Sequence, residues 1–391
     1  MISASKDSIS LSEQQHLEDK IGKIAEKIRA QGEKRRLLAK VIREAKKDFK
    51  LPVDDEKLQL VESEMVYKVG KAPLEDLTIG GVDGGVLNKP LHGLDLILVR
   101  AIAAIFSYED GELVSADYHP NEMPIPQLIN VHEPLNSREL DVLVGMKRQL
   151  KELKVAEEAL EAPNIDALML DGSIVPQYTD HSSGARLREL YKEITDSFTD
   201  LYRKCRNRDV LLLGAVKDSR SARLVKIFRN KIFSKVLENA DLPEAGVSSL
   251  DENKDVLTVS RDTAFLDYLL EAGERSFTFA YADAPAHLLE DLKDWKNKIF
   301  AFYVKPVSYD RPARVEFVAD PKQVSEKAGR AASLINSLSA DHEACALPSV
   351  LIEADARAAL PEEEISILRD NIADRLEPST MLDLRRERRP F

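Results

Sequence analysis

The stretch TIGGVDGGV (78–86), followed by LDLILVRAIAAIFSY (94–108), decides the fold. The first segment is apolar up to Asp83 and then runs into two glycines, which is typical of a strand that ends in a tight turn. The second is a long apolar run that contains β-branched and aromatic residues, which indicates a buried strand. The turn sequence EDGE (109–112) then predicts a hairpin to a third strand, 112–119. The sheet therefore begins with strands that are joined by short turns.

Further along the chain, apolar runs alternate with the periodic patterns of helices. The expected helices are 137–161, 184–205, one from about 220, 322–338 and 361–376, and the expected strands are 165–173, 210–219, 276–282, 300–307 and 313–319. The strands in the first part of the chain are joined by hairpins, and those that follow are separated by helices. This order is typical of a mixed sheet with helices on its faces. We therefore expect an α/β fold, with its main domain at residues 53–376.

A long amphipathic helix is expected before this domain, over residues 11–50. Its apolar residues recur at spacings of three and four, beginning with Leu17, Ile21, Ile24 and Ile28. Because a proline follows at position 52, we treat residues 1–52 as a separate N-terminal segment. A lone helix with an apolar stripe needs a partner surface on the body of the protein, on a second copy or on another protein. The last residues, 377–391, form a basic tail.

Composition excludes several classes of protein. The chain has 391 residues, of which 43% are hydrophobic, so a large core can be buried and global disorder is excluded. The 56 Lys and Arg are outnumbered by 68 Asp and Glu, so any contact with nucleic acid must come from local basic patches. Two cysteines cannot form a disulfide scaffold. We expect a cytoplasmic protein without membrane contacts, because no signal region is evident and the most apolar run, 94–106, is too short to span a bilayer.

Two aspartates follow apolar strands in a similar way. Asp83 stands in GGVDGG (80–85), and Asp171 stands in LMLDGS (168–173). Ligand sites of α/β sheets lie at strand ends, and carboxylates from two strands can converge there on one hard cation such as Mg²⁺ or Mn²⁺. The alternative is that each Asp-Gly pair only begins a turn.

A third strand end, GAVKDS (214–219), brings Lys217 to the same edge of the sheet. A cation beside carboxylates binds phosphate or shifts the carboxylate pKa values. The helix that follows carries a basic stripe at three-residue spacing, formed by Arg220, Arg223, Lys226 and Arg229. Such a stripe suits a DNA backbone, and the alternative is a solvated helix face.

Six motifs, taken in order, resemble the NurA nuclease family. They are GGVDGG, LMLDGS, GAVKDS, FYVKP (302–306), ARVEF (313–317) and LPSVLIEAD (347–355). The resemblance implies an RNase H-like mixed sheet and a Mn²⁺- or Mg²⁺-dependent DNA nuclease that acts in DNA end resection and repair. The implied activities are a 5′–3′ exonuclease and an endonuclease on single-stranded DNA. The resemblance also implies a homodimer that works with HerA, a hexameric ATPase translocase.

The same resemblance implies several site residues. Asp83 matches the first family aspartate, and Asp171 matches the second. The family also uses a glutamate on the helix before the second aspartate. In this chain Glu152 is the best match, and Glu157 and Glu158 are its rivals.

Near the C-terminus the chain departs from the family pattern. Family members often show a Tyr-Pro pair and an Ala-His pair, where this chain has Leu347-Pro348 and Ala354-Asp355. The resemblance therefore implies that Asp355 replaces a nitrogen ligand by a carboxylate. We expect Val350-Leu351-Ile352 to form a strand or buried segment that delivers Asp355 to the sheet edge. The alternative is an acid near a helix N-terminus, where the helix dipole stabilises it.

Together these residues predict a metal-dependent phosphodiesterase, in which carboxylates hold one or two ions that activate water. The expected metal ligands and catalytic acids are Asp83, Glu152, Asp171 and Asp355. The expected DNA contacts are Lys217, Arg220, Arg223 and Lys226, and Lys217 is also expected to act in catalysis. Two other function classes stay open. One is a nuclease-fold DNA-binding adaptor of a translocase, and the other is an actin-like or sugar-kinase fold with GGVDGG as its phosphate loop.

Overall fold

The computed structural model describes most of the chain, which divides into two compact units. The described residues are 11–45, 50–51, 60–176, 184–239, 244–281, 286–339, 345–376 and 382–384. The first unit comprises Met1–Leu51 and Arg220–Leu270, and the second comprises Pro52–Ser219 and Glu271–Phe391. The predicted basic tail, 377–391, lies outside the described residues except at 382–384.

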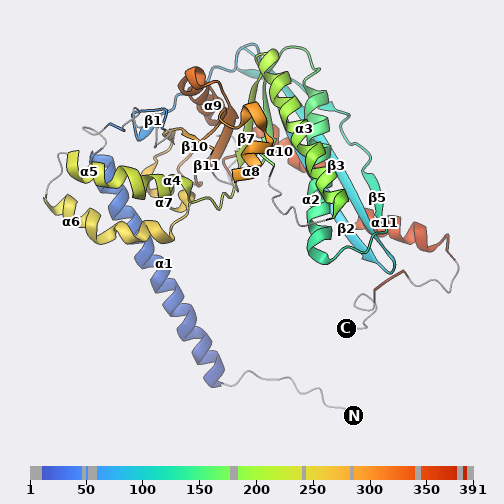
Figure 1. Ribbon diagram of the computed structural model, residues 1–391, viewed down its shortest axis with the longest axis horizontal. Helices are drawn as coiled ribbons and strands as arrows, with labels where there is room; N and C mark the ends of the chain where they lie inside the picture. Colours follow the sequence, from blue (N-terminus) through green and yellow to red (C-terminus); the bar gives the residue numbers. More distant parts are fainter. Residues whose placement is uncertain are drawn as a thin grey trace. The chain divides into compact units, whose positions relative to one another are not determined.

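The second unit is built on one mixed β-sheet, whose strands are drawn as arrows in Figure 1. Among the described residues the order is β1-β8-β10-β11-β7-β6-β2-β3-β4, with β5 also pairing with β3 and β9 with β10. The strands are β1 (Val66–Lys68), β2 (Leu77–Leu91), β3 (Leu94–Glu109), β4 (Glu112–His119), β5 (Gln127–Val131), β6 (Ile165–Asp171), β7 (Leu211–Val216), β8 (Glu274–Ser276), β9 (Phe279–Ala280), β10 (Ile299–Lys305) and β11 (Ala313–Val318). The helices of this unit are α2 (Ser137–Ala159), α3 (Ala185–Asn207), α8 (Ala286–Asp291), α9 (Val324–Leu338), α10 (Ser349–Ala358) and α11 (Glu362–Ala373).

The centre of this sheet combines antiparallel and parallel pairing. β2 and β3 form a long antiparallel hairpin, and β4 continues antiparallel beside β3. β6 lies parallel to β2, and β7 lies parallel to β6. Parallel neighbours need a crossover connection, and here α2 precedes β6 and α3 precedes β7. This arrangement confirms the predicted mixed sheet with flanking helices.

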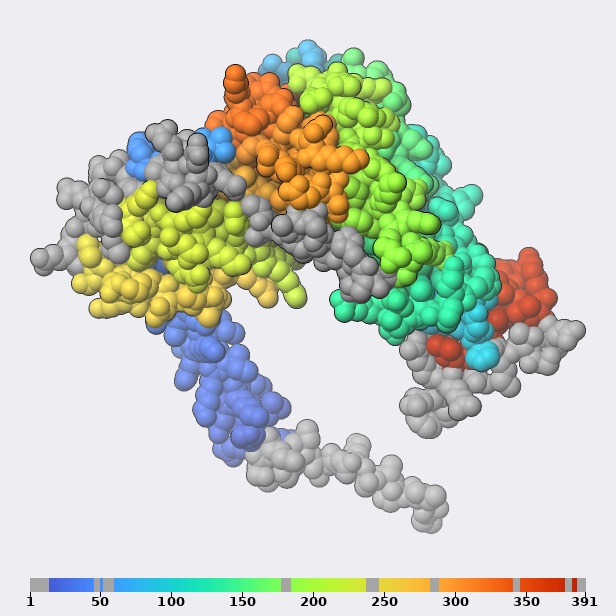
Figure 2. All heavy atoms as spheres, viewed as in Figure 1, coloured from blue at the N-terminus to red at the C-terminus, as the bar shows by residue number. Residues whose placement is uncertain are grey.

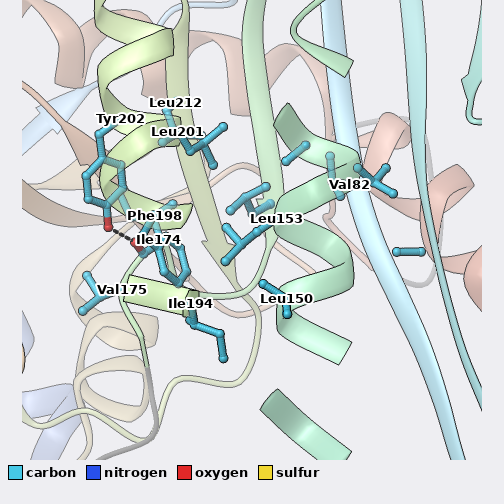
Figure 3. Packing of buried hydrophobic residues seen from close by; sticks show 14 of the residues in the cluster. Val82, Leu150, Leu153, Ile174, Val175, Ile194, Phe198, Leu201, Tyr202 and Leu212 are labelled. Carbon is cyan, nitrogen blue, oxygen red and sulfur yellow. Dashed lines mark hydrogen bonds between the residues drawn. The ribbon is translucent and has the colours of Figure 1, made fainter. Parts of the chain in front are cut away.

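Helices cover both faces of the sheet. On one face α2 and α3 bury an apolar cluster in which Leu153 and Phe198 lie together, as Figure 3 shows. The same figure shows the hydroxyl of Tyr202 donating a hydrogen bond to the carbonyl oxygen of Ile174. On the other face α9 and α10 bury a second cluster that includes Val350. The sheet is therefore fixed from both sides, which gives rigid positions to side chains at its centre.

The first unit is helical in its described part. Its elements are α1 (Leu11–Ala45), α4 (Arg223–Ile227), a π-helical turn (Phe228–Ile232), α5 (Phe233–Asn239), α6 (Glu244–Asn253), a 3₁₀ turn (Lys254–Val259) and α7 (Asp262–Leu269). The carboxylate of the fully buried Asp262 accepts hydrogen bonds from the N–H groups of Leu224 and Val225 at 3.1 and 2.8 Å. Because these N–H groups lie in the first turn of α4, Asp262 satisfies donors that the helix itself leaves unpaired.

The predicted helix over 11–50 is confirmed over Leu11–Ala45, but its apolar stripe is only partly covered. Leu38 and Ile42 are fully buried within the first unit. By contrast, the residues of the N-terminal half are 54 to 64% exposed, and these are Leu17, Ile21, Ile24 and Ile28. Figure 2 shows this half of α1, in blue, extending beyond the yellow helices of its unit. The first half of the helix thus presents an apolar stripe to solvent.

Two local predictions are wrong, and a third is confirmed only in part. The strand predicted at 78–86 does not end in a glycine turn but continues as β2 to Leu91, because β3 pairs with it over its whole length. The strand predicted at 276–282 is broken into β8 and β9. The segment 350–352, predicted as a strand or a buried segment, is buried at Val350 and Leu351 but forms the first turn of α10 rather than a strand. In the described part of the chain, no helix has an apolar stretch long enough to cross a membrane.

Candidate metal centre

Asp83 and Asp171 start from neighbouring positions on two parallel strands. Asp83 lies inside β2, whereas Asp171 is the last residue of β6 and is followed by Gly172 with a φ of +125°. The pairing of β2 with β6 stops at Val82 and Leu170, one residue before the two aspartates. Since successive side chains alternate between the faces of a sheet, both aspartates point to the same face. The sequence pattern therefore identified two adjacent acids, although only one of them ends its strand.

A third aspartate reaches this place from α10. Oxygen atoms of Asp83, Asp171 and Asp355 all lie within 4.8 Å of one another. Asp83 is buried, Asp171 is half-buried and Asp355 is exposed, so the cluster opens to solvent on the Asp355 side. Asp355 lies in the second turn of α10 rather than at its N-terminus. The alternative that it serves as an acid near a helix N-terminus is therefore wrong.

Two glycines allow α10 to lie this close to β2. A Cβ atom on Gly81 would lie 2.7 Å from the carbonyl oxygen of Val350, and a Cβ atom on Gly85 would overlap the carbonyl oxygen of Ala358. Residues 81, 83 and 85 share one face of the strand because side chains alternate. The missing side chains thus make room for the helix that carries the third aspartate next to Asp83.

The surroundings of Asp83 disfavour its charged form. Burial, the nearby carboxylate of Asp171 and a hydrogen bond with Asp355 together raise the pKa of Asp83 to about 8. The N–H group of Gly84 donates to Asp83 Oδ1 at 2.7 Å and opposes this rise. A bound cation would relieve the repulsion among these carboxylates, and carboxylate oxygens are the ligands that Mg²⁺ and Mn²⁺ prefer. The donor set therefore fits either ion.

Glu152 approaches the same cluster from the other face of β2. It lies on α2, and a Cβ atom on Gly84 would lie 2.6 Å from Glu152 Oε1. Burial raises the pKa of Glu152 to about 7, the guanidinium of Arg148 at 3.3 Å counteracts this effect, and the charge of Asp171 adds to it. The charge of Asp171 therefore affects the ionisation of Glu152. Glu152 is nevertheless not one of the three residues whose oxygen atoms lie within 4.8 Å of one another.

The two rival glutamates of α2 have other partners. Glu157 Oε2 lies 2.7 Å from Lys204 Nζ on α3, and Glu158 Oε2 lies 2.8 Å from His119 Nε2 at the end of β4. Both glutamates thus form ion pairs or hydrogen bonds at the surface of the helix. Of the three candidates, the geometry favours Glu152 as the acid that accompanies the aspartates.

Lys217 joins the cluster directly after β7. Its Nζ lies 2.7 Å from Asp171 Oδ2, and the side chain is 33% exposed. Burial alone would lower the pKa of Lys217, but the hydrogen bond and the charge of Asp171 outweigh it, so the pKa lies above its usual value. Lys217 therefore remains a cation beside the aspartates, where it can contact both a carboxylate and an incoming phosphate.

The other predicted DNA contacts belong to the first unit. Arg223 and Lys226 lie on α4, and Arg220 lies before the helix begins. Arg220 and Lys226 are exposed, and Arg223 is half-buried. The aspartate cluster belongs to the second unit, so the basic stripe and the cluster are features of separate parts of the chain.

Sequence reasoning missed a buried glutamate that holds the turn after Asp171. Glu316 Oε2 on β11 accepts a hydrogen bond from Ser173 Oγ at 2.6 Å and another from the N–H of Ile174 at 3.2 Å. Its Oε1 lies 2.9 Å from Arg314 Nε, and both side chains of this ion pair are almost fully buried. The motif ARVEF contained a signal, because two charges inside an apolar strand are rarely buried unless they are paired.

Three acids at the centre of a mixed sheet define an α/β protein with a carboxylate cluster that could hold a metal ion. The model of the NurA domain family matches residues 77–360. This match covers more than half of the chain, so the protein belongs to the NurA family. A comparison with curated protein sequences finds no match.

Several solved structures of NurA proteins match the chain. The NurA nuclease from Sulfolobus solfataricus is 15% identical, with a TM-score of 0.53, and the alignment covers 93% of this chain and 99% of that one. A NurA structure with manganese is 15% identical, with a TM-score of 0.44 and coverage of 81% and 92%. A NurA structure bound to dAMP and manganese is 12% identical, with a TM-score of 0.41 and coverage of 80% and 90%. The first of these likenesses supports the fold described above.

Asp355→Ala is expected to weaken binding of Mn²⁺ by ~10-fold or more, because it removes one of three converging carboxylates. The side chain is exposed, so the free energy of unfolding of the metal-free chain should change by less than about 1 kcal/mol. Calorimetric titration with Mn²⁺ and urea unfolding measure the two quantities. Glu189→Ala, which removes an exposed acid on α3, is the matched control. Wild-type Mn²⁺ affinity in Asp355→Ala would remove this residue from the centre.

Proposed function

We propose that this chain is a Mn²⁺- or Mg²⁺-dependent DNA nuclease. The observation that carries the proposal is the convergence of Asp83, Asp171 and Asp355 within 4.8 Å, with Lys217 in contact with one of them. Membership in the NurA family supports it, as does the likeness in fold to a NurA nuclease. A centre of this kind, where hard ligands and a cation meet at an open surface, can catalyse hydrolysis of a phosphodiester.

Each residue of the centre would have a different role in hydrolysis. Asp83, Asp171 and Asp355 would hold the ion, which when bound supplies activation of water and stabilisation of the leaving oxygen. Glu152 is held beside them as a fourth acid by α2. Lys217 would neutralise part of the charge of the phosphate, and its contact with Asp171 orients it towards the centre.

We further propose that the nuclease has 5′–3′ exonuclease activity and endonuclease activity on single-stranded DNA. It would serve DNA end resection and repair in the cytoplasm. Lys217 would contact the strand at the centre, and the basic residues of the first unit would contact the DNA backbone. These are Arg220, Arg223 and Lys226. Positive side chains bind phosphates mainly through their charge, so this contact should weaken as salt is raised.

The decisive experiment uses the full chain with end-labelled single- and double-stranded DNA. Cleavage is expected with Mn²⁺ or Mg²⁺, loss of cleavage with a chelator, and recovery when the metal is restored in excess. Labels at either end give the polarity. Binding of DNA with no cleavage in either metal would favour the alternative of a non-catalytic adaptor.

The alternative of an actin-like or sugar-kinase fold loses its main support. In that fold GGVDGG would form the phosphate loop. Residues 80–85 instead lie inside β2 and pair with β3 throughout. A phosphate loop needs a turn whose N–H groups are free to point at the ligand. ATP hydrolysis by the isolated chain is therefore not expected.

We also propose that the chain is a homodimer and works with a HerA-type hexameric ATPase. The exposed apolar stripe of α1 supports an interface of one of these two kinds, because apolar rows on a helix are costly to leave in water.

Ile21→Glu combined with Ile24→Glu is expected to abolish dimerisation or binding of the ATPase, measured by light scattering and by co-purification. Lys23→Glu is the control on the same helix. A double variant that stays dimeric and still binds the ATPase would contradict this role of α1.

A further inference from the structure

A cavity of ≈ 370 Å³ lies beside the aspartate centre in the second unit. Its walls come from three places: residues 217–218 after β7, residues 310–311 with Ala313 at the start of β11, and residues 345–347 before α10. The first wall includes Lys217, which is in contact with Asp171. The third wall leads directly into the helix that carries Asp355. Anything bound in this cavity would therefore be next to the metal centre.

One carboxylate joins two of these walls. Asp310 Oδ1 accepts a hydrogen bond from the N–H of Arg311 at 2.7 Å, and Asp310 Oδ2 accepts one from the N–H of Ala346 at 2.7 Å. Because both oxygens of Asp310 are engaged in this way, the carboxylate serves to fix the two loops. The bond from Ala346 thus connects the loop after β10 to the segment before α10.

The charges that line the cavity suit an anion. Arg311 is exposed, and within the described residues its guanidinium takes part in no hydrogen bond or ion pair that would neutralise it. Lys217 provides a second cation at the side of the centre, and Asp218 is the one exposed acid among the lining residues. Ala313, Ala346 and Leu347 add apolar surface. The lining thus holds two cations and two acids, Asp218 and Asp310, and both oxygens of Asp310 already accept backbone N–H groups. Two cations beside an apolar wall can bind a phosphate joined to a sugar or a base.

We propose that this cavity binds one unpaired nucleotide of the substrate strand, adjacent to the cleaved phosphate, with the nucleotide's phosphate between Lys217 and Arg311. The proposal rests on the nuclease function proposed above and adds a subsite to it. The volume is at the lower end of the range for small-ligand pockets, about 300–1,000 Å³, and so admits a single nucleotide rather than a duplex. The strand must therefore be unpaired where it passes the cavity.

Arg311→Ala tests the cationic wall. It is expected to raise KM for a single-stranded oligonucleotide about 10-fold, because a charge-assisted hydrogen bond is lost. The slope of log KM against log salt should fall by about 0.7, the value for one phosphate contact on a single strand. The rate constant kcat and the Mn²⁺ concentration for half activity should not change. Arg311→Lys should restore the salt slope, and Arg203→Ala, which removes an exposed arginine on α3, should change neither quantity.

Cys345 offers a second test, because it can be labelled selectively. It is partly exposed in the wall of the cavity, whereas Cys205 is buried and its burial raises the pKa of the thiol to about 12. A bulky maleimide on Cys345 is expected to abolish binding of a fluorescent single-stranded oligonucleotide to the metal-free chain. Calorimetric Mn²⁺ binding should be unaffected. Cys345→Ala treated with the same reagent is the control and should bind normally.

The outcomes separate this subsite from the nuclease function. Wild-type KM and salt slope in Arg311→Ala, or wild-type oligonucleotide binding after Cys345 is labelled, would overturn the subsite while leaving the nuclease in place. If the wild-type chain cleaves no DNA in any metal but binds the oligonucleotide in a manner that needs Arg311 and an unlabelled Cys345, the nuclease proposal fails and the nucleotide site stands.

Discussion

Asp83→Asn and Asp171→Asn are each expected to lower metal-dependent cleavage of DNA by ~1,000-fold or more. An amide is a poor ligand for a hard cation, and the ion supplies several kcal/mol of transition-state stabilisation, of which each 1.4 kcal/mol corresponds to about tenfold in rate. Cleavage of an end-labelled strand in Mn²⁺ measures the loss. Near-wild-type cleavage by either variant would show that the three aspartates are not the catalytic centre.

The same Asp83→Asn change is expected to stabilise the metal-free fold at pH 8. The folded-state pKa of this acid is raised to about 8, whereas in the unfolded chain it ionises near its ordinary value. Between these two pH values the unfolded chain releases a proton that the folded chain retains, so folding becomes less favourable as pH rises through this window. Asparagine removes this penalty and can keep the hydrogen bond from the N–H of Gly84.

Thermal unfolding with and without Mn²⁺ at pH 5 and pH 8 tests this account. At pH 8 without metal the variant should unfold about 2–4 °C above the wild type, a difference that should shrink at pH 5. With Mn²⁺ the order should reverse, because only the wild type gains stability from the ion. A variant less stable than the wild type at pH 8 without metal would contradict the assigned repulsion.

The pattern of an apolar strand followed by Asp and Gly was sufficient to find Asp83 and Asp171. Sheet geometry explains this success, because apolar runs mark the central strands and the parallel pairing of two such strands brings equivalent positions together. The pattern did not show that β2 continues for eight residues beyond Asp83, to Leu91. A run of glycines disfavours a strand locally, but pairing with β3 overrides that preference.

The sequence identified Asp355 as a residue delivered by a strand or buried segment, whereas the structure places it on the helix α10. Three consecutive apolar residues, 350–352, fit a buried strand as well as a helix, since a run this short has no resolvable period. The spacing of the apolar residues over the longer segment 350–358 is that of a helix. Four of them are buried along one side of α10: Val350, Leu351, Ala354 and Ala358. Asp355 therefore reaches the centre from above the sheet rather than from its edge.

The contact between Glu316 and Ser173 lay beyond what the sequence could predict. They are separated by 143 positions and meet only because β11 lies beside β7, which in turn lies beside β6. Nothing in the local pattern around Ser173 indicates a buried carboxylate as its partner. Contacts of this kind depend on strand order, which is the property that a single sequence specifies least directly.

Gly85→Ala is expected to have the largest effect on stability of any single methyl group added near the centre. The new Cβ would overlap the carbonyl oxygen of Ala358, which is backbone and cannot rotate away. The end of α10 is also held by Arg100, whose Nη1 donates to the carbonyl oxygen of Ala359 at 3.0 Å, so the helix is not free to move. Overpacking against a fixed backbone should cost about 3 kcal/mol or more.

Two other glycines provide matched controls in the same unit. Gly84→Ala places its Cβ 2.6 Å from Glu152 Oε1 and 2.8 Å from Glu152 Cγ, but these atoms belong to a side chain that can rotate, so the chain should fold while Glu152 is displaced. Gly329→Ala, on α9, meets no atom within 4 Å in the described part of the chain and should raise the free energy of unfolding by about 0.5–1 kcal/mol. Urea unfolding should therefore rank the variants Gly329→Ala, wild type, Gly84→Ala and Gly85→Ala in decreasing stability. If Gly85→Ala is as stable as Gly84→Ala, α10 does not lie against β2 as described, and Asp355 would have no fixed place beside Asp83.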